Sequence, residues 1–223
     1  MAEEKWQIHA HRGGRNEFDE NTLSAFQASY AKGLRGFETD VRMCKDGALV
    51  IMHDGTIERT IANGKYQISM TAADEYFWTF TYLPDVSAND LSLSVDMTVI
   101  ETSAQAGDLT VSFSLRSTGG DYYNFYFYND GGYEVVVWKG GGYTSLIDVS
   151  DSTAFSLQPG IQNTVTILAS GSTFTVSMNG AELYTLTDDS LTEAGDITIG
   201  LCLDDTGDTL VIEFDNLVIQ TAP

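Results

Sequence analysis

Residues 91–99 read LSLSVDMTV, and residues 109–115 read LTVSFSL. In both stretches every second residue is apolar, and the residues between are small and polar or acidic. Side chains of a β-strand point alternately to its two faces, so this period of two predicts strands with one buried and one exposed face. The two stretches therefore predict an antiparallel β-sheet that packs on a core.

The same pattern continues along most of the chain after Gly64. Turn residues such as Gly119-Gly120 and Asn179-Gly180 separate the stretches, as they do between paired strands. Many short strands, with no second convincing helix, predict a mainly β fold, a jelly-roll-type β-sandwich. Further strands are predicted at residues 123–128, 133–139, 164–169, 173–178, 197–203 and 210–219.

Residues 122–128 read YYNFYFY and are the densest group of aromatic side chains in the chain. One face of this strand can belong to the core, while the other can stack on sugar rings. A tyrosine-rich solvent face with ordinary cross-strand pairs explains the same pattern, and both interpretations stay open. Alternation divides the rings into Tyr122, Tyr126 and Tyr128 on one face and Tyr123, Phe125 and Phe127 on the other.

The formal net charge of −21 is unevenly distributed. Up to Thr60 eight Lys and Arg stand against ten Asp and Glu, whereas three stand against 22 after it. This shift predicts two domains, residues 1–61 and 62–223. The acidity excludes nucleic acid and anionic membrane surfaces as partners. No apolar run of 18 residues occurs, so no membrane span is expected.

The pattern of the first 60 residues differs from the rest, because it predicts a helix between strands instead of strands alone. Residues 8–10 are a short apolar stretch, followed by a helix that carries Leu23, Phe26 and Tyr30 and ends near Gly33. Strands are predicted at residues 37–43 and 48–53, joined at Asp46-Gly47, a strong signal for a two-residue hairpin turn. Such a turn would place Asp40 opposite His53, with Glu38 on the same strand face.

Five short motifs stand in this region in a fixed order. They are HRGG at residues 11–14, ENT-x2-AF at 20–26, ETDV at 38–41, KDG at 45–47 and V-x2-HD at 50–54. As a set they resemble the start of the glycerophosphodiester phosphodiesterase family. The resemblance covers about residues 8–60. It implies a TIM barrel that uses a divalent metal, Ca²⁺ or Mg²⁺, to cleave glycerophosphodiesters.

The resemblance also implies roles for individual residues. Cleavage of a phosphodiester needs a charge clamp on the phosphoryl oxygens and a proton donor and acceptor that work near neutral pH. Hard divalent cations prefer the oxygen ligands of Asp and Glu. The implied roles are His11 and His53 as the acid/base pair, Arg12 on the phosphate, Glu38 and Asp40 as metal ligands, and Glu20 in support of the site.

Two departures limit this resemblance. Family members supply a further metal-binding glutamate and a lysine from a later strand, and no such Glu-x-Lys strand follows Thr60. A TIM barrel also needs roughly 250 residues. We therefore expect a short βαβ piece that resembles the start of a barrel. The chain alone then acts in glycan or protein binding or in assembly; alternatively, it is a metal-dependent hydrolase if the rest of the barrel is supplied.

The later part resembles the laminin-G-like or concanavalin-like jelly rolls found beside many bacterial enzymes, modules that are often glycan-binding or adhesive. The resemblance rests on NTVT at residues 163–166, TFTVSMNG at 173–180 and FDNLVI at 214–219. An acidic group near the end of the chain can either chelate Ca²⁺ or consist of solvated turn residues. It comprises Asp204, Asp205, Asp208 and Asp215.

Partners and location follow only in part from these patterns. We expect a glycan or protein ligand for the sandwich, and self-association is left open. Residues 1–14 lack a basic start followed by an apolar core, so no secretory signal is expected there. The location is left open between cytoplasmic and extracellular.

Overall fold

The computed structural model describes residues 9–11, 23–37, 39, 41–43, 49–51, 59–62, 65–150 and 152–221. The chain divides into two compact units, Met1–Ile57 and Glu58–Pro223. The sequence placed the boundary between residues 61 and 62, whereas strand β5 (Arg59–Ala62) pairs with β6 (Lys65–Thr71) in the second unit. Each unit is described by itself below.

The first unit contains a short βαβ piece. Strand β1 (His9–Ala10) lies parallel to β2 (Gly36–Phe37), and helix α1 (Leu23–Ala31) connects them. The helix ends as Gly33 predicts: Gly33 has a φ of 95°, and its N–H donates to Tyr30 O while Leu34 N–H donates to Ser29 O. These two bonds form the Schellman motif that a glycine in the left-handed region permits.

The predicted strand over residues 37–43 is in fact two strands in different sheets. Strand β3 (Val41–Met43) pairs antiparallel with β4 (Leu49–Ile51), and Met43 lies opposite Leu49. A two-residue turn at Asp46-Gly47 would have placed Met43 opposite Val50, so the predicted register is wrong by one residue, while the turn itself lies outside the described residues. The expected pairing of Asp40 with His53 depended on that turn, and both residues lie outside the described part of the chain.

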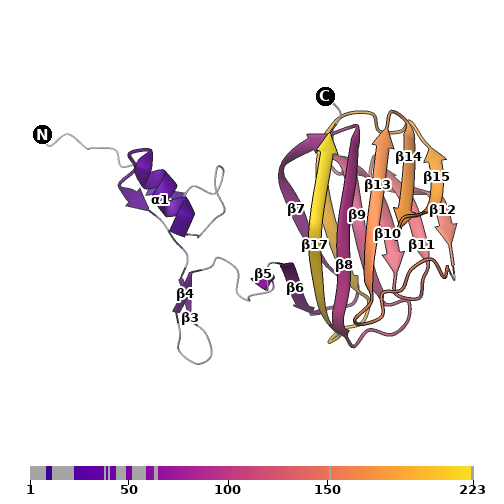
Figure 1. Ribbon diagram of the computed structural model, residues 1–223, viewed down its shortest axis with the longest axis horizontal. Coiled ribbons are helices and arrows are strands. Elements are labelled where there is room, and N and C mark those ends of the chain that lie inside the picture. Colours follow the sequence, from indigo (N-terminus) through magenta and orange to yellow (C-terminus); the bar gives the residue numbers. More distant parts are fainter. Residues whose placement is uncertain are drawn as a thin grey trace, which may run out of the picture. The chain divides into compact units, whose positions relative to one another are not determined.

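The second unit is a sandwich of two antiparallel sheets, so the predicted mainly β fold is confirmed (Figure 1). One sheet has the order β12-β11-β10-β9-β16-β7, and the other has the order β15-β14-β13-β8-β17-β6-β5. In Figure 1 the seven-stranded sheet lies in front and the six-stranded sheet behind it. The strands not yet given are β7 (Phe77–Ala88), β8 (Leu91–Thr102), β9 (Leu109–Thr118), β10 (Asp121–Tyr128), β11 (Tyr133–Lys139), β12 (Gly142–Val149), β13 (Gln162–Ser170), β14 (Thr173–Met178), β15 (Ala181–Thr187), β16 (Gly195–Leu203) and β17 (Thr209–Thr221).

Strand β7 was not predicted from the sequence, although its Trp78 lines a hollow on the sheet. Pro84 interrupts its sequence, and proline cannot donate a ladder hydrogen bond. The structure accommodates it because β7 is an edge strand, with β16 as its neighbour. The pairing also shifts register between Asp196 and Thr198.

The core fills the space between the sheets with the apolar side of each alternating strand. Phe174 of β14 reaches across to β10, with its ring centroid 4.6 Å from Tyr123 and 5.7 Å from Phe125. On the six-stranded sheet Phe113 and Phe127 form an edge-to-face pair at 6.2 Å. All five rings are fully buried. Aromatic pairs across sheets therefore join the two layers.

A buried arginine closes one end of this core. Arg116 lies on β9 with a φ of 55°, next to a register shift between β9 and β10, and its side chain is buried. Its guanidinium donates to the carbonyl oxygens of Asn89, Leu191 and Gly171 and lies 4.8 Å above the Phe174 ring. Burial lowers the pKa of Arg116, while the three carbonyls accept three of its five N–H donors and the Asp90 carboxylate lies 3.7 Å from the guanidinium.

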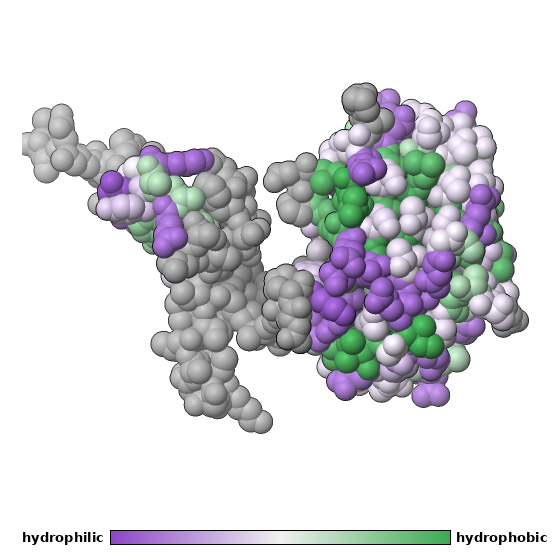
Figure 2. All heavy atoms as spheres, in the orientation of Figure 1, coloured by the Kyte–Doolittle hydropathy of each residue, from purple (hydrophilic) through white to green (hydrophobic). Residues whose placement is uncertain are grey.

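The outer face of the seven-stranded sheet is chemically mixed. Figure 2 shows this side of the sandwich, where separate hydrophobic patches are divided by polar side chains. The exposed apolar residues of β13 and β17 are Leu168, Leu217 and Val218. Scattered exposed apolar residues are normal for soluble domains, so this face by itself indicates no binding site.

Tyr123→Phe tests how the core is fixed at its polar end. The Tyr123 hydroxyl donates to Asp188 Oδ1 at 2.5 Å and accepts from Leu191 N–H. Although burial opposes it, hydrogen bonds from Tyr123 and Ser190 lower the pKa of Asp188. A carboxylate whose pKa is lowered on folding stabilises the folded state above its unfolded-state pKa, and this stabilisation is lost as the pH falls through its folded-state pKa. The free energy of unfolding of the variant should be about 1–3 kcal/mol lower than that of the unchanged protein at neutral pH. Urea titrations should show a smaller difference at about pH 3.

Tyr133→Phe is the matched control, because no hydrogen bond of the Tyr133 hydroxyl is found among the described residues. An equal loss at both pH values in Tyr123→Phe would contradict the role of Asp188.

Candidate functional site

Most residues of the predicted phosphodiesterase site lie outside the described part of the chain. Arg12, Glu20, Glu38, Asp40 and His53 are among those residues. His11 is described, and it is exposed directly after β1. Because β1 and β2 are parallel, His11 lies at the sheet end where β2 also ends.

The acidic residues near the end of the chain are not brought together. Asp204 and Asp205 lie in the loop after β16, whereas Asp215 lies on β17 beside a different pocket. Asp208 accepts a hydrogen bond from Ser103 Oγ at 2.7 Å. Within the described ranges, no three His, Cys, Asp or Glu side chains gather closely enough to hold a metal ion.

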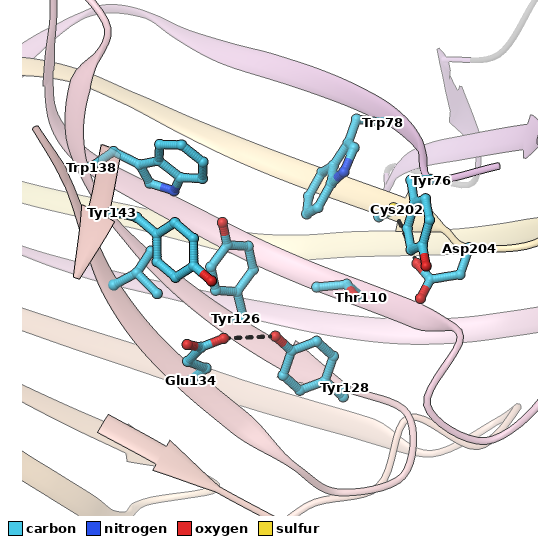
Figure 3. A pocket seen from close by; sticks show the side chains of 11 residues that line it. Tyr76, Trp78, Thr110, Tyr126, Tyr128, Glu134, Trp138, Tyr143, Cys202 and Asp204 are labelled. Carbon is cyan, nitrogen blue, oxygen red and sulfur yellow. Dashed lines mark hydrogen bonds between the residues drawn. The ribbon is translucent and has the colours of Figure 1, made fainter. Parts of the chain in front are cut away.

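The best-formed candidate site is a hollow on the outer face of the six-stranded sheet, here called the aromatic groove (Figure 3). It encloses about 230 Å³. Strands from the whole width of the sheet contribute to it, together with two loops. Its residues are Trp78 of β7, Thr110 of β9, Tyr126 and Tyr128 of β10, Glu134, Val136 and Trp138 of β11, Tyr143 of β12, Cys202 of β16, and the loop residues Tyr76 and Asp204.

Small polar residues form the middle of this outer face. On an open sheet they would be exposed, yet each is at most 5% exposed. Other side chains therefore cover them, and of this set only Thr110 lines the groove. Ser114 Oγ donates to Asn124 Oδ1 at 3.2 Å, whereas Ser112 Oγ has no hydrogen-bond partner among the described residues. The set comprises Thr110, Ser112, Ser114, Asn124 and Thr198.

One wall depends on a glycine. Trp78 and Phe80 of β7 are stacked, with centroids 5.6 Å apart and planes 4° apart. A Cβ at Gly200 of the neighbouring β16 would lie 3.1 Å from the Phe80 ring and 2.5 Å from Ser112 Oγ. Only glycine leaves room for the Phe80 ring at this position.

The other wall is formed by β10, β11 and β12. The Trp138 ring lies 5.1 Å from Tyr143 and 6.0 Å from Tyr122. Its indole nitrogen is buried, faces Tyr126 in Figure 3, and makes no hydrogen bond of normal geometry with any described residue. Although burial raises the pKa of Tyr126, an interaction of its side chain with this N–H lowers that pKa, and the interaction offsets part of the cost of burying the donor.

A strained loop places the remaining groups. Tyr76 has a φ of 54°, a conformation that a bulky residue rarely adopts and that costs about 1–3 kcal/mol. Its N–H donates to Asp204 O at 2.9 Å, and Gly207 N–H donates to Ala72 O nearby. These bonds tie the loop before β7 to the loop after β16, and they hold the Tyr76 ring beside the Asp204 carboxylate (Figure 3).

The groove is electronegative. Burial raises the pKa of Tyr126 and, together with Glu134, that of Tyr128, whose hydroxyl donates to Glu134 Oε2 at 3.2 Å. Burial and Asp204 raise the pKa of the Cys202 thiol. Burial, with the charges of nearby aspartates, also raises the pKa of Asp204. Ionised tyrosine and thiol groups are therefore disfavoured in the groove.

A second hollow of about 520 Å³ lies at the turn between β9 and β10. It is lined by Tyr82 and Tyr122 together with the backbone around Gly119 and Gly195. Tyr122 stacks on Trp138 of the aromatic groove, so aromatic side chains continue from one hollow to the next. The outer face therefore offers an extended, ring-lined surface.

The alternation in residues 122–128 is confirmed, because Tyr123, Phe125 and Phe127 are fully buried and the other tyrosines line the two hollows. Sequence analysis missed Trp78, Trp138 and Tyr143. Two of these rings have a local signal, since Trp138 and Tyr143 flank the Gly140–Gly142 turn of a hairpin. Trp78 joins them only through pairing of β7 with a distant strand.

The sequence model of the glycerophosphoryl diester phosphodiesterase family matches residues 11–104, less than half of the chain. Similar proteins include the uncharacterized protein YqiK of Bacillus subtilis, 41% identical over 68 residues, which are 30% of this chain and 28% of YqiK. A probable glycerophosphodiester phosphodiesterase 1 of Mycobacterium tuberculosis is 38% identical over 89 residues, 38% of this chain and 32% of that protein. The resemblance inferred from the motifs is confirmed, and the chain spans about a third of these relatives or less.

Solved structures are similar to the sandwich. Carbohydrate binding module CBM66 from Bacillus subtilis has a TM-score of 0.53 and 12% identity, over 82% of this chain and 92% of that one. A Bacillus licheniformis β-glucanase has a TM-score of 0.55 and 12% identity, over 74% and 83%. At such identities the similarity shows the fold alone, and it confirms the jelly-roll-type sandwich. Within the described residues, no helix is long and apolar enough to cross a membrane.

The thiol of Cys202 tests the depth of the groove. In a Cys44→Ser background it should not react with a thiol reagent such as DTNB in the folded protein, because it is buried and its pKa is raised. In guanidinium it should react fully. A Tyr143→Cys thiol in the same background is the control, because position 143 is exposed. Equal rates for the two thiols in the folded state would show that the groove floor is open.

Proposed function

We propose that the sandwich binds a glycan in the aromatic groove and that the chain joins this binding module to a segment resembling the start of a phosphodiesterase. The observation that carries the proposal is the groove itself: a hollow in which aromatic rings surround the polar side chains of Thr110, Glu134 and Asp204. Ligand sites combine apolar walls with a few polar groups that fix orientation. Sugars need both, since their rings have apolar C–H faces and hydroxyl edges.

The walls supply flat surfaces at several positions. Tyr143 is 62% exposed and packs beside Trp138, so its ring can meet a sugar face at little cost. Trp78 on the opposite wall has its centroid 6.0 Å from Tyr126. Stacking on such rings adds binding free energy beyond the buried area.

The polar groups supply hydrogen bonds. The Tyr128 hydroxyl, whose proton is donated to Glu134, can accept from a ligand hydroxyl, and so can the Glu134 and Asp204 carboxylates. The similar solved structures include a protein titled as a carbohydrate binding module and a β-glucanase. Their shared fold supports the proposal without identifying a sugar.

Truncation of Tyr143 tests the proposal. A glycan array should first give a ligand, and Tyr143→Ala should then weaken its binding about fivefold, since a stacked ring contributes roughly 1 kcal/mol. A double variant with Trp78→Ala and Trp138→Ala should abolish binding in calorimetry.

Leu168→Ala is the control for both variants. Leu168 is 46% exposed on the seven-stranded sheet, so its truncation should leave affinity unchanged. An array without hits, or equal losses for Tyr143→Ala and Leu168→Ala, would reject a glycan site in the groove.

A second candidate function is metal-dependent hydrolysis of glycerophosphodiesters when the rest of a barrel is supplied. Two observations favour it: the family match from residue 11 onward, and the parallel pair β1 and β2 with His11 directly after β1. His11 and His53 would transfer protons and Arg12 would hold the phosphate. Glu38 and Asp40, supported by Glu20, would hold Ca²⁺ or Mg²⁺, which would supply charge stabilisation on the phosphoryl oxygens.

Release of glycerol phosphate from glycerophosphocholine tests this candidate. With Ca²⁺, Mg²⁺ or Mn²⁺ present, any activity should fall at least about 100-fold in His11→Ala. His9→Ala is the matched control, because His9 lies two residues away in β1 and outside the HRGG motif. Absence of turnover with all three metals would reject the candidate for this chain.

A further inference from the structure

The charged side chains at the aromatic groove all have one sign. Glu134 on one side and Asp204 on another contribute carboxylates, and none of the described lysines and arginines lines the groove. After Thr60 the sequence holds three basic residues, and each is engaged elsewhere. Lys139 donates to Ser190 O at 2.8 Å, Lys65 pairs with Glu213 at 3.2 Å, and Arg116 is buried at the end of the core.

Neither carboxylate forms a salt bridge with a cation in the described part of the chain. Glu134 Oε2 accepts from the Tyr128 hydroxyl at 3.2 Å, which orients the carboxylate and leaves Oε1 open. Asp204 Oδ1 accepts only a weak bond of 3.5 Å from the Cys202 thiol. Two acidic groups that are partly withdrawn from water and lack a counter-charge favour a cationic ligand.

The aromatic rings beside these carboxylates favour the same kind of ligand. Tyr126 and Tyr128 stack with centroids 6.3 Å apart, and Trp78 stands edge-on to Tyr126. Ring faces of tryptophan and tyrosine attract cations, and rings arranged around a small pocket recognise alkylammonium groups. A volume of about 230 Å³ suits one sugar residue or a small headgroup.

We propose that the aromatic groove selects a ligand that carries an alkylammonium group, with the charge near Glu134 and Asp204 and the carbon substituents against the rings. This inference rests on the proposed function in that it uses the same groove. An amino sugar or a choline-type headgroup carries this chemistry. Anionic sugars are excluded from the groove by the two carboxylates.

Matched oligosaccharides distinguish the inference from the proposed function. The full chain is titrated at mildly acidic pH with short β-1,4-linked oligomers of glucosamine, of N-acetylglucosamine and of glucose, and separately with tetramethylammonium chloride. The glucosamine oligomer should bind about tenfold more tightly than the two neutral oligomers, a difference of roughly 1.4 kcal/mol. Tetramethylammonium should compete with it. Equal affinities for all three oligomers would overturn the inference and leave glycan binding intact.

The remaining outcomes separate the two ligand sources. Binding of tetramethylammonium without any oligosaccharide would support the inference through a headgroup, and together with an array without hits it would reject the glycan function. Binding of none of the four probes would overturn the inference, and the array alone would then decide the glycan function.

Charge variants exclude general attraction to an acidic protein. Glu134→Gln and Asp204→Asn should each weaken binding of the glucosamine oligomer about tenfold and weaken binding of the neutral oligomers much less, because the amide oxygen of the new side chain still accepts from a hydroxyl but carries no charge. Glu101→Gln removes the same charge from an exposed position on β8 and should have no effect. Equal losses in Glu134→Gln and Glu101→Gln would overturn the proposal. Thermal unfolding of each variant confirms that the sandwich is intact.

Discussion

The sandwich depends on strict two-residue alternation along β10. Phe125 lies opposite Phe113 of β9 on one side and Val135 of β11 on the other, so the inward side chains of three strands meet in one layer. The same register turns Tyr126 outward into the groove. A shift by one residue would exchange the two sets, which would place tyrosine hydroxyls in the core and phenylalanines in water. The core and the candidate site are thus fixed by one constraint.

The places where alternation fails are equally informative. At Arg116 the positive φ adds an inward residue to β9, and a long cationic side chain enters the end of the core. Three carbonyls and the Phe174 ring stabilise it there. This arrangement removes one of three cations of the acidic domain from its surface. The outer face of the same sheet therefore carries one positive charge fewer. In this way the burial of Arg116 favours cationic over anionic ligands at that face.

Local patterns predicted what depends on neighbours in sequence. The alternation of residues 109–115 and 122–128 identified strands and their buried faces, and Gly33 identified the end of the helix. The hairpin register failed, because Asp-Gly also occurs in longer turns. The groove could not be predicted, because it needs Trp78 of β7 and Asp204 of a distant loop, and their positions follow from strand order. Nearness in sequence grouped Asp204 with Asp215, whereas the sheet separates them.

The two parts of the chain make opposite electrostatic demands on a ligand. The phosphodiesterase-like motifs bring histidines, an arginine and carboxylates of the kind that hold a metal on an anionic phosphate. The groove brings rings and carboxylates without a cation. The two carboxylates of the groove therefore repel a phosphate unless its carrier also holds a positive group. This repulsion acts within roughly 8 Å, the distance over which physiological salt leaves charges unscreened. Because like charges repel, the groove favours the positively charged part of a ligand over any phosphate that the ligand carries.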